Sequence, residues 1–158
     1  MINKTLILAI GNSLLSDEGA GIHALNLLRQ QRPETPDVEY LDGGTLSFTL
    51  AAAIEEANHL IVLDAAQLDA PPGTVNLFVG EEMDRFLGRP RRSVHEVGIT
   101  DLMDMVRLTE RLPVKRALIG IQPQALGWGE VPTPAVAAGL PEMVRLAIAL
   151  LDQWSIYC

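Results

Sequence analysis

Hydrophobic residues along this chain fall into short runs of strand length that alternate with longer amphipathic stretches. A short continuous apolar run is typical of a buried strand, whereas apolar residues that recur every three or four positions indicate a helix. The short runs predict strands at residues 5–10, 38–41, 59–63, 74–79 and 117–121. The longer stretches predict helices at residues 21–31, 46–57, 100–111 and 134–154.

Strands and helices that alternate in this way form βαβ units, so the sequence predicts an α/β fold with a parallel sheet. The strand at residues 74–79 follows a Pro71-Pro72-Gly73 turn and is expected to be antiparallel or to lie at an edge. Residues 81–92 are polar and are predicted to be irregular, with one helical turn. A chain of 158 residues fits a single domain, residues 1–158.

Composition narrows the class of protein further. Hydrophobic residues make up 48% of the chain and aromatic residues 4%, so the core must be mostly aliphatic. The net charge of -8 argues against binding to nucleic acid or to anionic membranes, which both require a basic surface. The only cysteine is Cys158, which excludes a disulfide framework and indicates a reducing, cytoplasmic location. The first apolar run is too short for a signal peptide or a membrane span, so we expect no membrane insertion. We also expect a monomer, because the chain fits one compact acidic domain.

Polar residues of unusual placement follow the predicted strands. Glu18 follows the first strand, Asp42 the second and Asp64 the third. In an open parallel sheet the carboxyl ends of the strands share one rim, where ligands bind, and the loop that carries His95 can reach the same rim. Two carboxylates and an imidazole suit a divalent transition metal with open coordination positions, which can polarise a carbonyl group or activate water.

Each of these residues also has an ordinary structural interpretation. Asp17 and Glu18 could cap the helix that begins near residue 21 and interact favourably with its dipole. Asp42 stands before two glycines and could be a turn residue. A single histidine in a polar loop, such as His95, is more often structural than a metal ligand.

Other known motifs do not match the sequence. The glycines from Gly11 to Gly21 lack the spacing of a dinucleotide or phosphate-binding loop. The segment His95-Glu96-Val97-Gly98-Ile99 lacks the second histidine of a zinc-peptidase helix, and no Gly-x-Ser-x-Gly elbow occurs. His23 and His59 are interpreted as structural, because neither is placed at the rim.

Five segments of the sequence together resemble the NiFe-hydrogenase maturation endopeptidases. They are residues 11–21 (GNSLLSDEGAG), 41–45 (LDGGT), 62–65 (VLDA), 93–98 (SVHEVG) followed by Asp101-Leu102, and 120–123 (GIQP) followed by Trp128-Gly129. One such segment alone would be weak support. The five occur in order, so the resemblance covers nearly the whole chain.

The resemblance implies a three-layer helix–sheet–helix fold with a twisted, mostly parallel five-stranded sheet. It also implies a nickel- or zinc-type site made by Glu18, Asp64 and His95. The implied activity is removal of a short C-terminal extension from the nickel-loaded precursor of a hydrogenase large subunit. The nickel is then carried by the substrate, and zinc or cadmium could occupy the site as a surrogate.

A mechanism for such an enzyme follows as a hypothesis. Glu18, Asp64 and His95 engage the nickel of the precursor, which positions the scissile peptide. Asp64 or Glu18 takes the proton of the attacking water. Asp42 orients a ligand from outside the coordination sphere.

Three alternatives remain open from the sequence. A nickel-binding assembly factor without peptidase activity would use the same three ligands. A related peptidase could act on a different protein. A phospho-acceptor receiver domain also carries acids after its strands, but it needs a lysine at the end of the last strand, where Gln122-Pro123 stands here, with Lys115 ahead of that strand.

Overall fold

The computed structural model describes residues 3–44, 50–89 and 99–155. The strands are β1 (Thr5–Ala9), β2 (Val38–Asp42), β3 (His59–Ala65), β4 (Val75–Val79) and β5 (Lys115–Ile121). The helices are α1 (Ala20–Gln31), α2 (Leu50–Glu56), α3 (Glu81–Leu87), α4 (Ile99–Leu108) and α5 (Pro134–Ser155), with a short 3₁₀ helix, η1, at Ser16–Gly19. Nearly every predicted element is therefore present, with ends that shift by a few residues.

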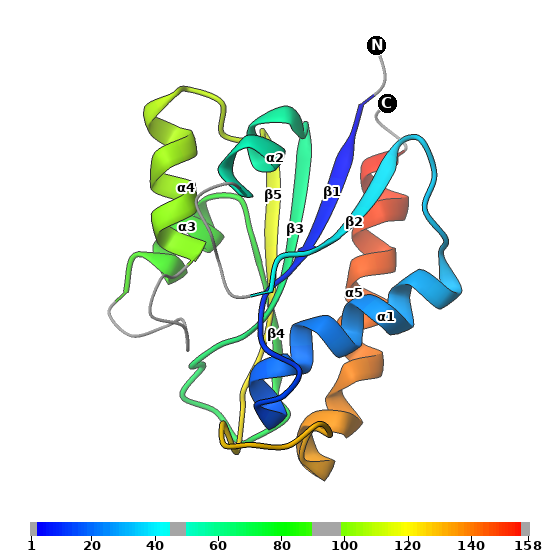
Figure 1. Ribbon diagram of the computed structural model, residues 1–158. Helices are drawn as coiled ribbons and strands as arrows, with labels where there is room; N and C mark the ends of the chain where they lie inside the picture. Colours follow the sequence, from blue (N-terminus) through cyan, green and yellow to red (C-terminus); the bar gives the residue numbers. More distant parts are fainter. Residues whose placement is uncertain (1–2, 45–49, 90–98, 156–158) are drawn as a thin grey trace.

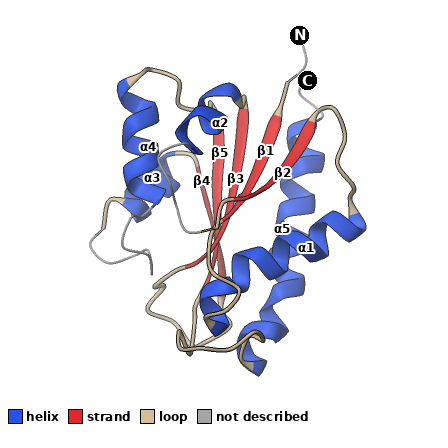
Figure 2. Ribbon diagram, in the orientation of Figure 1, coloured by secondary structure: helices blue, strands red, loops and turns tan. Residues whose placement is uncertain are grey.

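The five strands form one sheet in the order β2-β1-β3-β5-β4 (Figure 1). β2, β1, β3 and β5 run parallel, and β4 pairs with β5 in the antiparallel direction at the sheet edge. Helices α1 and α5 cover one face of the sheet, and α2, α3 and α4 cover the other (Figure 2). The prediction of a three-layer, mostly parallel α/β fold is confirmed.

β3 occupies the centre of the sheet, and all seven of its residues are buried. A parallel strand covered by helices on both faces reads as a continuous apolar run, which explains the sequence pattern here. The strand continues two residues beyond the predicted end, because Asp64 pairs with Gly120 and Ala65 with Ile121 of β5. Asp64 therefore lies within β3 and not after it.

Helix α3 is longer than predicted. Residues 81–87 form a helix, whereas their polar composition indicated an irregular segment with a single helical turn. Three buried residues, Met83, Phe86 and Leu87, recur at helical spacing and pack into the core, and the acids of the first turn suit the helix dipole. These three apolar residues alternate with four charged ones, Glu81, Glu82, Asp84 and Arg85, which hid the helical pattern.

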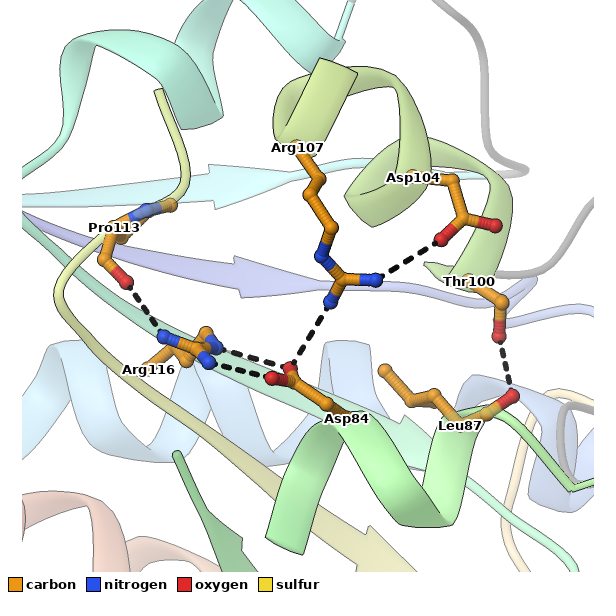
Figure 3. Close-up of polar contacts among 7 residues, drawn as sticks. All are labelled: Asp84, Leu87, Thr100, Asp104, Arg107, Pro113 and Arg116. Carbon is orange, nitrogen blue, oxygen red and sulfur yellow. Dashed lines mark hydrogen bonds and ion pairs between the residues drawn. The ribbon is translucent and has the colours of Figure 1, made fainter. Parts of the chain in front are cut away.

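The outer face of α3 is fixed to β5 and α4 by charge pairs around Asp84 (Figure 3). Arg116 donates from Nε to Asp84 Oδ1 at 3.0 Å and from Nη1 to the carbonyl oxygen of Pro113 at 3.2 Å. β5 begins at Lys115, two residues earlier than predicted, because Lys115 pairs with His59 and Arg116 with Leu60 of β3. Lys115 is thus the first residue of β5, at the end of the sheet opposite to the acids, where a receiver-domain lysine could not act.

Helix α5 is long and apolar enough to cross a membrane by length and composition. Its buried residues, however, form part of the core that α5 shares with α1 and the sheet. Trp154, near its carboxyl end, packs edge-on against the ring of His59, with ring centroids 5.4 Å apart. The apolar character of α5 is therefore used in packing against α1 and the sheet.

Candidate active site

Asp64 is a buried carboxylate near the carboxyl end of the central strand, with an exposed fraction of only 2%. Burial raises the pKa of Asp64 well above its ordinary value. A hydrogen bond from the backbone of Ala65 acts in the opposite direction, and the charge of Glu18 raises the pKa further. A strand-end acid with a strongly raised pKa is a candidate for chemistry, because structural carboxylates are usually held in their charged form.

Glu18 lies in η1, the short helix between β1 and α1, and burial raises its pKa as well. Two glycines bring this segment against the sheet. Gly11 has φ of +143°, and a Cβ there would lie 2.1 Å from the carbonyl oxygen of Glu18. Gly21, at the start of α1, would place a Cβ 2.4 Å from the carbonyl oxygen of Leu63. The two close approaches hold Glu18 within electrostatic reach of Asp64.

Asp42 is exposed at the end of β2, and the structure does not place it beside Asp64. β1 lies between β2 and β3, which separates the two backbones by roughly 10 Å, or two strand spacings. Asp42 and Leu63 are both level with Ala9, so Asp42 shares the face of Leu63 and Asp64 belongs to the opposite face.

The carboxylate of Asp42 instead accepts a hydrogen bond from the backbone N–H of Gly44 at 2.9 Å. The carbonyl oxygen of Gly44 in turn accepts from the N–H of Gly11, also at 2.9 Å. Asp42 is therefore a turn residue, as its ordinary interpretation held. Through this turn it supports Gly11, the residue that contacts the backbone of Glu18.

Asp17 has a role that the sequence did not reveal. The N-cap positions of η1 and α1 are Leu15 and Gly19, and neither makes a side-chain capping bond, so the helix-capping interpretation of Asp17 is wrong. Its buried carboxylate accepts hydrogen bonds from the N–H groups of Gln124, Ala125 and Thr133 at 2.8, 2.9 and 2.7 Å, and from the Thr133 hydroxyl group.

Burial alone would raise the pKa of Asp17, but these hydrogen bonds outweigh burial and lower it. Asp17 thus stays charged and holds both ends of the loop at residues 124–133. No local signal could have identified this role, because its partners lie more than 100 positions along the chain.

Gln122, just after β5, is buried and serves the adjacent loop. Its Oε1 accepts from the N–H of Leu68 at 2.7 Å, and its Nε2 donates to the carbonyl oxygen of Pro123 at 3.3 Å. His59 lies at the amino end of the sheet, away from the acids, which fits its structural interpretation. Nε2 of His23 is buried and has no hydrogen-bond partner among the residues described.

The predicted ligand His95 lies outside the described residues. Within the described ranges, no group of three or more His, Cys, Asp or Glu side chains is arranged to hold a metal ion. The described part of the candidate site is thus the pair Glu18 and Asp64. Two neighbouring carboxylates suit a divalent cation or a water that must lose a proton, and they leave coordination positions open.

A separate hollow of about 510 Å³ lies at the opposite, amino end of the strands. Thr5, Tyr40 and His59 line it, together with the ion pair of Arg32 and Asp152. It shares no residue with the acidic pair. The candidate active site at the carboxyl rim is therefore separate from this hollow.

The chain is thus a small open α/β domain with paired acids at its carboxyl rim, and comparison with known proteins narrows its class. The sequence matches the hydrogenase maturation protease family over residues 22–150. The chain belongs to this family, which confirms the resemblance seen in the sequence.

Individual relatives agree with this assignment. The chain is 36% identical over 155 residues to the hydrogenase expression/formation protein HupD of Bradyrhizobium diazoefficiens, covering 98% of this chain and 81% of that protein. It is 33% identical over 152 residues to the hydrogenase 2 maturation protease of Escherichia coli, covering 95% and 92% of the two chains.

Solved structures match the fold equally well. The hydrogenase maturating endopeptidase HybD from Escherichia coli superimposes with a TM-score of 0.87 at 31% identity, over 95% of this chain and 93% of that one. The NiFe hydrogenase maturation protease HybD from Thermococcus kodakarensis gives a TM-score of 0.78 at 32% identity, over 93% and 98%. The α/β architecture is thus shared with maturation proteases.

Proposed function

We propose that this protein is a metal-dependent endopeptidase that removes a C-terminal extension from the nickel-loaded precursor of a NiFe-hydrogenase large subunit. The proposal places the reaction in the cytoplasm, where the single cysteine would stay reduced. The observation that carries it is the buried carboxylate of Asp64, within electrostatic reach of Glu18, at the carboxyl rim of a maturation-protease fold.

The electrostatics of the pair support recognition of a cation. Burial and mutual repulsion make two neighbouring carboxylates costly when both are charged. A divalent cation reverses this situation, because it favours the charged form of every carboxylate that it touches. We assign the nickel of the precursor to Glu18 and Asp64, with His95 as a third ligand and zinc or cadmium as possible surrogates.

The remaining roles follow from position. Binding the nickel brings the adjacent scissile peptide to the rim, which supplies proximity and orientation. Asp64 or Glu18 accepts the proton of the attacking water, since each is a carboxylate at the position where the peptide is held. Asp42 acts at a distance, through the Gly44 turn that supports Gly11.

The test is to mix the purified protein with a large-subunit precursor, with and without nickel, and to measure intact mass. Loss of one C-terminal peptide in the loaded sample alone is the expected result. The variants Glu18→Gln and His95→Ala should lose this cleavage, and equal rates in either variant would refute the assigned roles. An unchanged mass with retained binding to the loaded precursor would indicate an assembly factor instead.

A further inference from the structure

Four large apolar side chains are exposed on two segments near the acidic pair. They are Leu14, Leu126, Trp128 and Val131, with exposed fractions of 49%, 43%, 84% and 74%. These four residues, called the apolar platform below, make up half of the large exposed hydrophobic residues in the described ranges. Both segments lie at the carboxyl end of the sheet, one after β1 and the other after β5 (Figure 1).

The two segments of the platform are joined by backbone pairing. Leu15 and Gly129 form a parallel β-bridge, which places Leu14 next to Trp128. The N–H of Gly129 donates to the carbonyl oxygen of Leu14 at 2.9 Å, and the N–H of Ser16 donates to that of Gly129 at 2.8 Å. The Ser16 hydroxyl group also donates to the carbonyl oxygen of Gly127 at 2.8 Å. The backbone segments that carry Leu14 and Trp128 are therefore fixed relative to each other.

The platform is also coupled directly to the candidate active site. Asp17 binds both ends of the 124–133 loop, and Glu18 is the next residue in the chain. Ser16, on the other side of Asp17, has a positive φ of 51°, a strained conformation that its bonds to the loop maintain. One short segment thus fixes the positions of the acid and of the apolar surface relative to each other.

We propose that the apolar platform binds an apolar, extended segment of the hydrogenase precursor next to the scissile bond. This inference rests on the function proposed above and adds the surface that recognises the protein part of the substrate. Trp128 is its central contact, since a nearly fully exposed indole next to a reactive site is the residue type that most often dominates binding.

The size of the platform and the net charge of the whole chain favour this occupant. Four such side chains present on the order of 500 Å² of apolar surface, which is within the range of functional patches. Stable dimers bury more, about 800 Å² per partner, so the patch suits a substrate that must leave after each turnover. The net charge of -8 disfavours an anionic membrane as the occupant.

The experiment compares Trp128→Ala with two matched controls, Leu108→Ala and Val114→Ala. The control residues are 85% and 86% exposed, and neither belongs to the platform. Processing kinetics and binding are both measured with the nickel-loaded precursor. We expect Trp128→Ala to raise KM and Kd about tenfold or more with kcat within about twofold, and Trp128→Phe to restore most of the affinity. The controls should match wild type, and thermal unfolding should be unchanged in all four variants.

Several results would overturn the inference. One is a KM and Kd for Trp128→Ala equal to wild type. Others are an equal effect in the two controls, or a dimer of the wild type that Trp128→Ala dissociates in light scattering. A wild type that binds the loaded precursor without cutting it would refute the proposed peptidase activity. The Kd values of the variants would then still test the platform. A wild type that neither binds nor cuts refutes both.

Discussion

Two buried aspartates, Asp17 and Asp64, illustrate how environment separates a structural acid from a candidate reactive one. Both lie at the carboxyl rim, and both are nearly inaccessible to solvent. Hydrogen bonds lower the pKa of Asp17 despite its burial, whereas burial and the charge of Glu18 raise that of Asp64. Divergent pKa values in neighbouring acids often mark a division of roles.

Asp17→Asn should lower the free energy of unfolding by about 2–4 kcal/mol, because the amide cannot accept all the hydrogen bonds that the carboxylate receives. Urea denaturation of the variant and the wild type measures the difference. Asp152→Asn is the control, since Asp152 pairs with Arg32 on an exposed surface and should matter by less than about 1 kcal/mol. An equal effect of the two substitutions would show that Asp17 does not anchor the loop.

Asp64→Asn should affect the protein in the opposite way, because it should keep the stability of the fold and lower the activity. A buried carboxylate with a raised pKa opposes folding at neutral pH, and the isosteric amide removes that charge. We therefore expect an unfolding free energy equal to or above that of wild type, with precursor cleavage reduced by about 100-fold or more. A variant that unfolds more easily and still cleaves would assign Asp64 to the core and not to catalysis.

The arrangement of the strands explains why Glu18 and Asp64 lie close together. Strand-end acids were predictable from the sequence, because short apolar runs locate β1 and β3 and parallel strands end at one rim. The exact placement of Asp42 was not predictable, because the face of the sheet on which it lies depends on the pairing register of β2 with β1. The role of Asp17 was also hidden, since it depends on a loop that follows β5.

Packing of α1 against the sheet depends on Gly21. An added methyl group would lie 2.4 Å from the carbonyl oxygen of Leu63 and 2.9 Å from that of Ile10, both backbone atoms that cannot rotate away. Gly21→Ala should therefore destabilise the fold by about 3 kcal/mol or more and displace Glu18 from Asp64. Chemical denaturation measures the first effect and precursor cleavage the second.

Gly127→Ala is the control for stability, because an added Cβ there meets no other atom within 4 Å. It should change the unfolding free energy by less than about 0.5 kcal/mol. If Gly21→Ala were equally mild, α1 would have room to move, and its close approach would not be what holds Glu18 near Asp64.

At the scale of the whole molecule, the two ends of the sheet carry different features. The carboxyl rim carries the acids and the apolar platform, whereas the amino end carries the hollow and the contact between His59 and Trp154. The helix–sheet–helix layers were predictable because apolar periodicity determines them. The position of the hollow was not predictable, since it depends on how the helices and the sheet are arranged in space.

The amino end should make global stability depend on pH through His59. Burial lowers the pKa of His59 below the ordinary value of 6.5, and the nearby charge of Lys115 lowers it further. Above pH 6.5 the imidazole is neutral in both the folded and the unfolded chain, so it has no effect on stability. As the pH falls through 6.5, the unfolded chain takes up a proton that the folded protein does not, and the free energy of unfolding decreases until the lower folded pKa is passed.

Urea denaturation between about pH 5 and 8 tests this coupling in the wild type and in His59→Gln. The wild type should lose stability on acidification across this range, and the variant should lose less, because glutamine does not titrate. Asp152, Arg32 and Lys115 face the same end of the molecule and are present in both proteins, so the comparison isolates residue 59. Parallel pH profiles for the two proteins would place the titrating group elsewhere and would separate the stability of the amino end from His59.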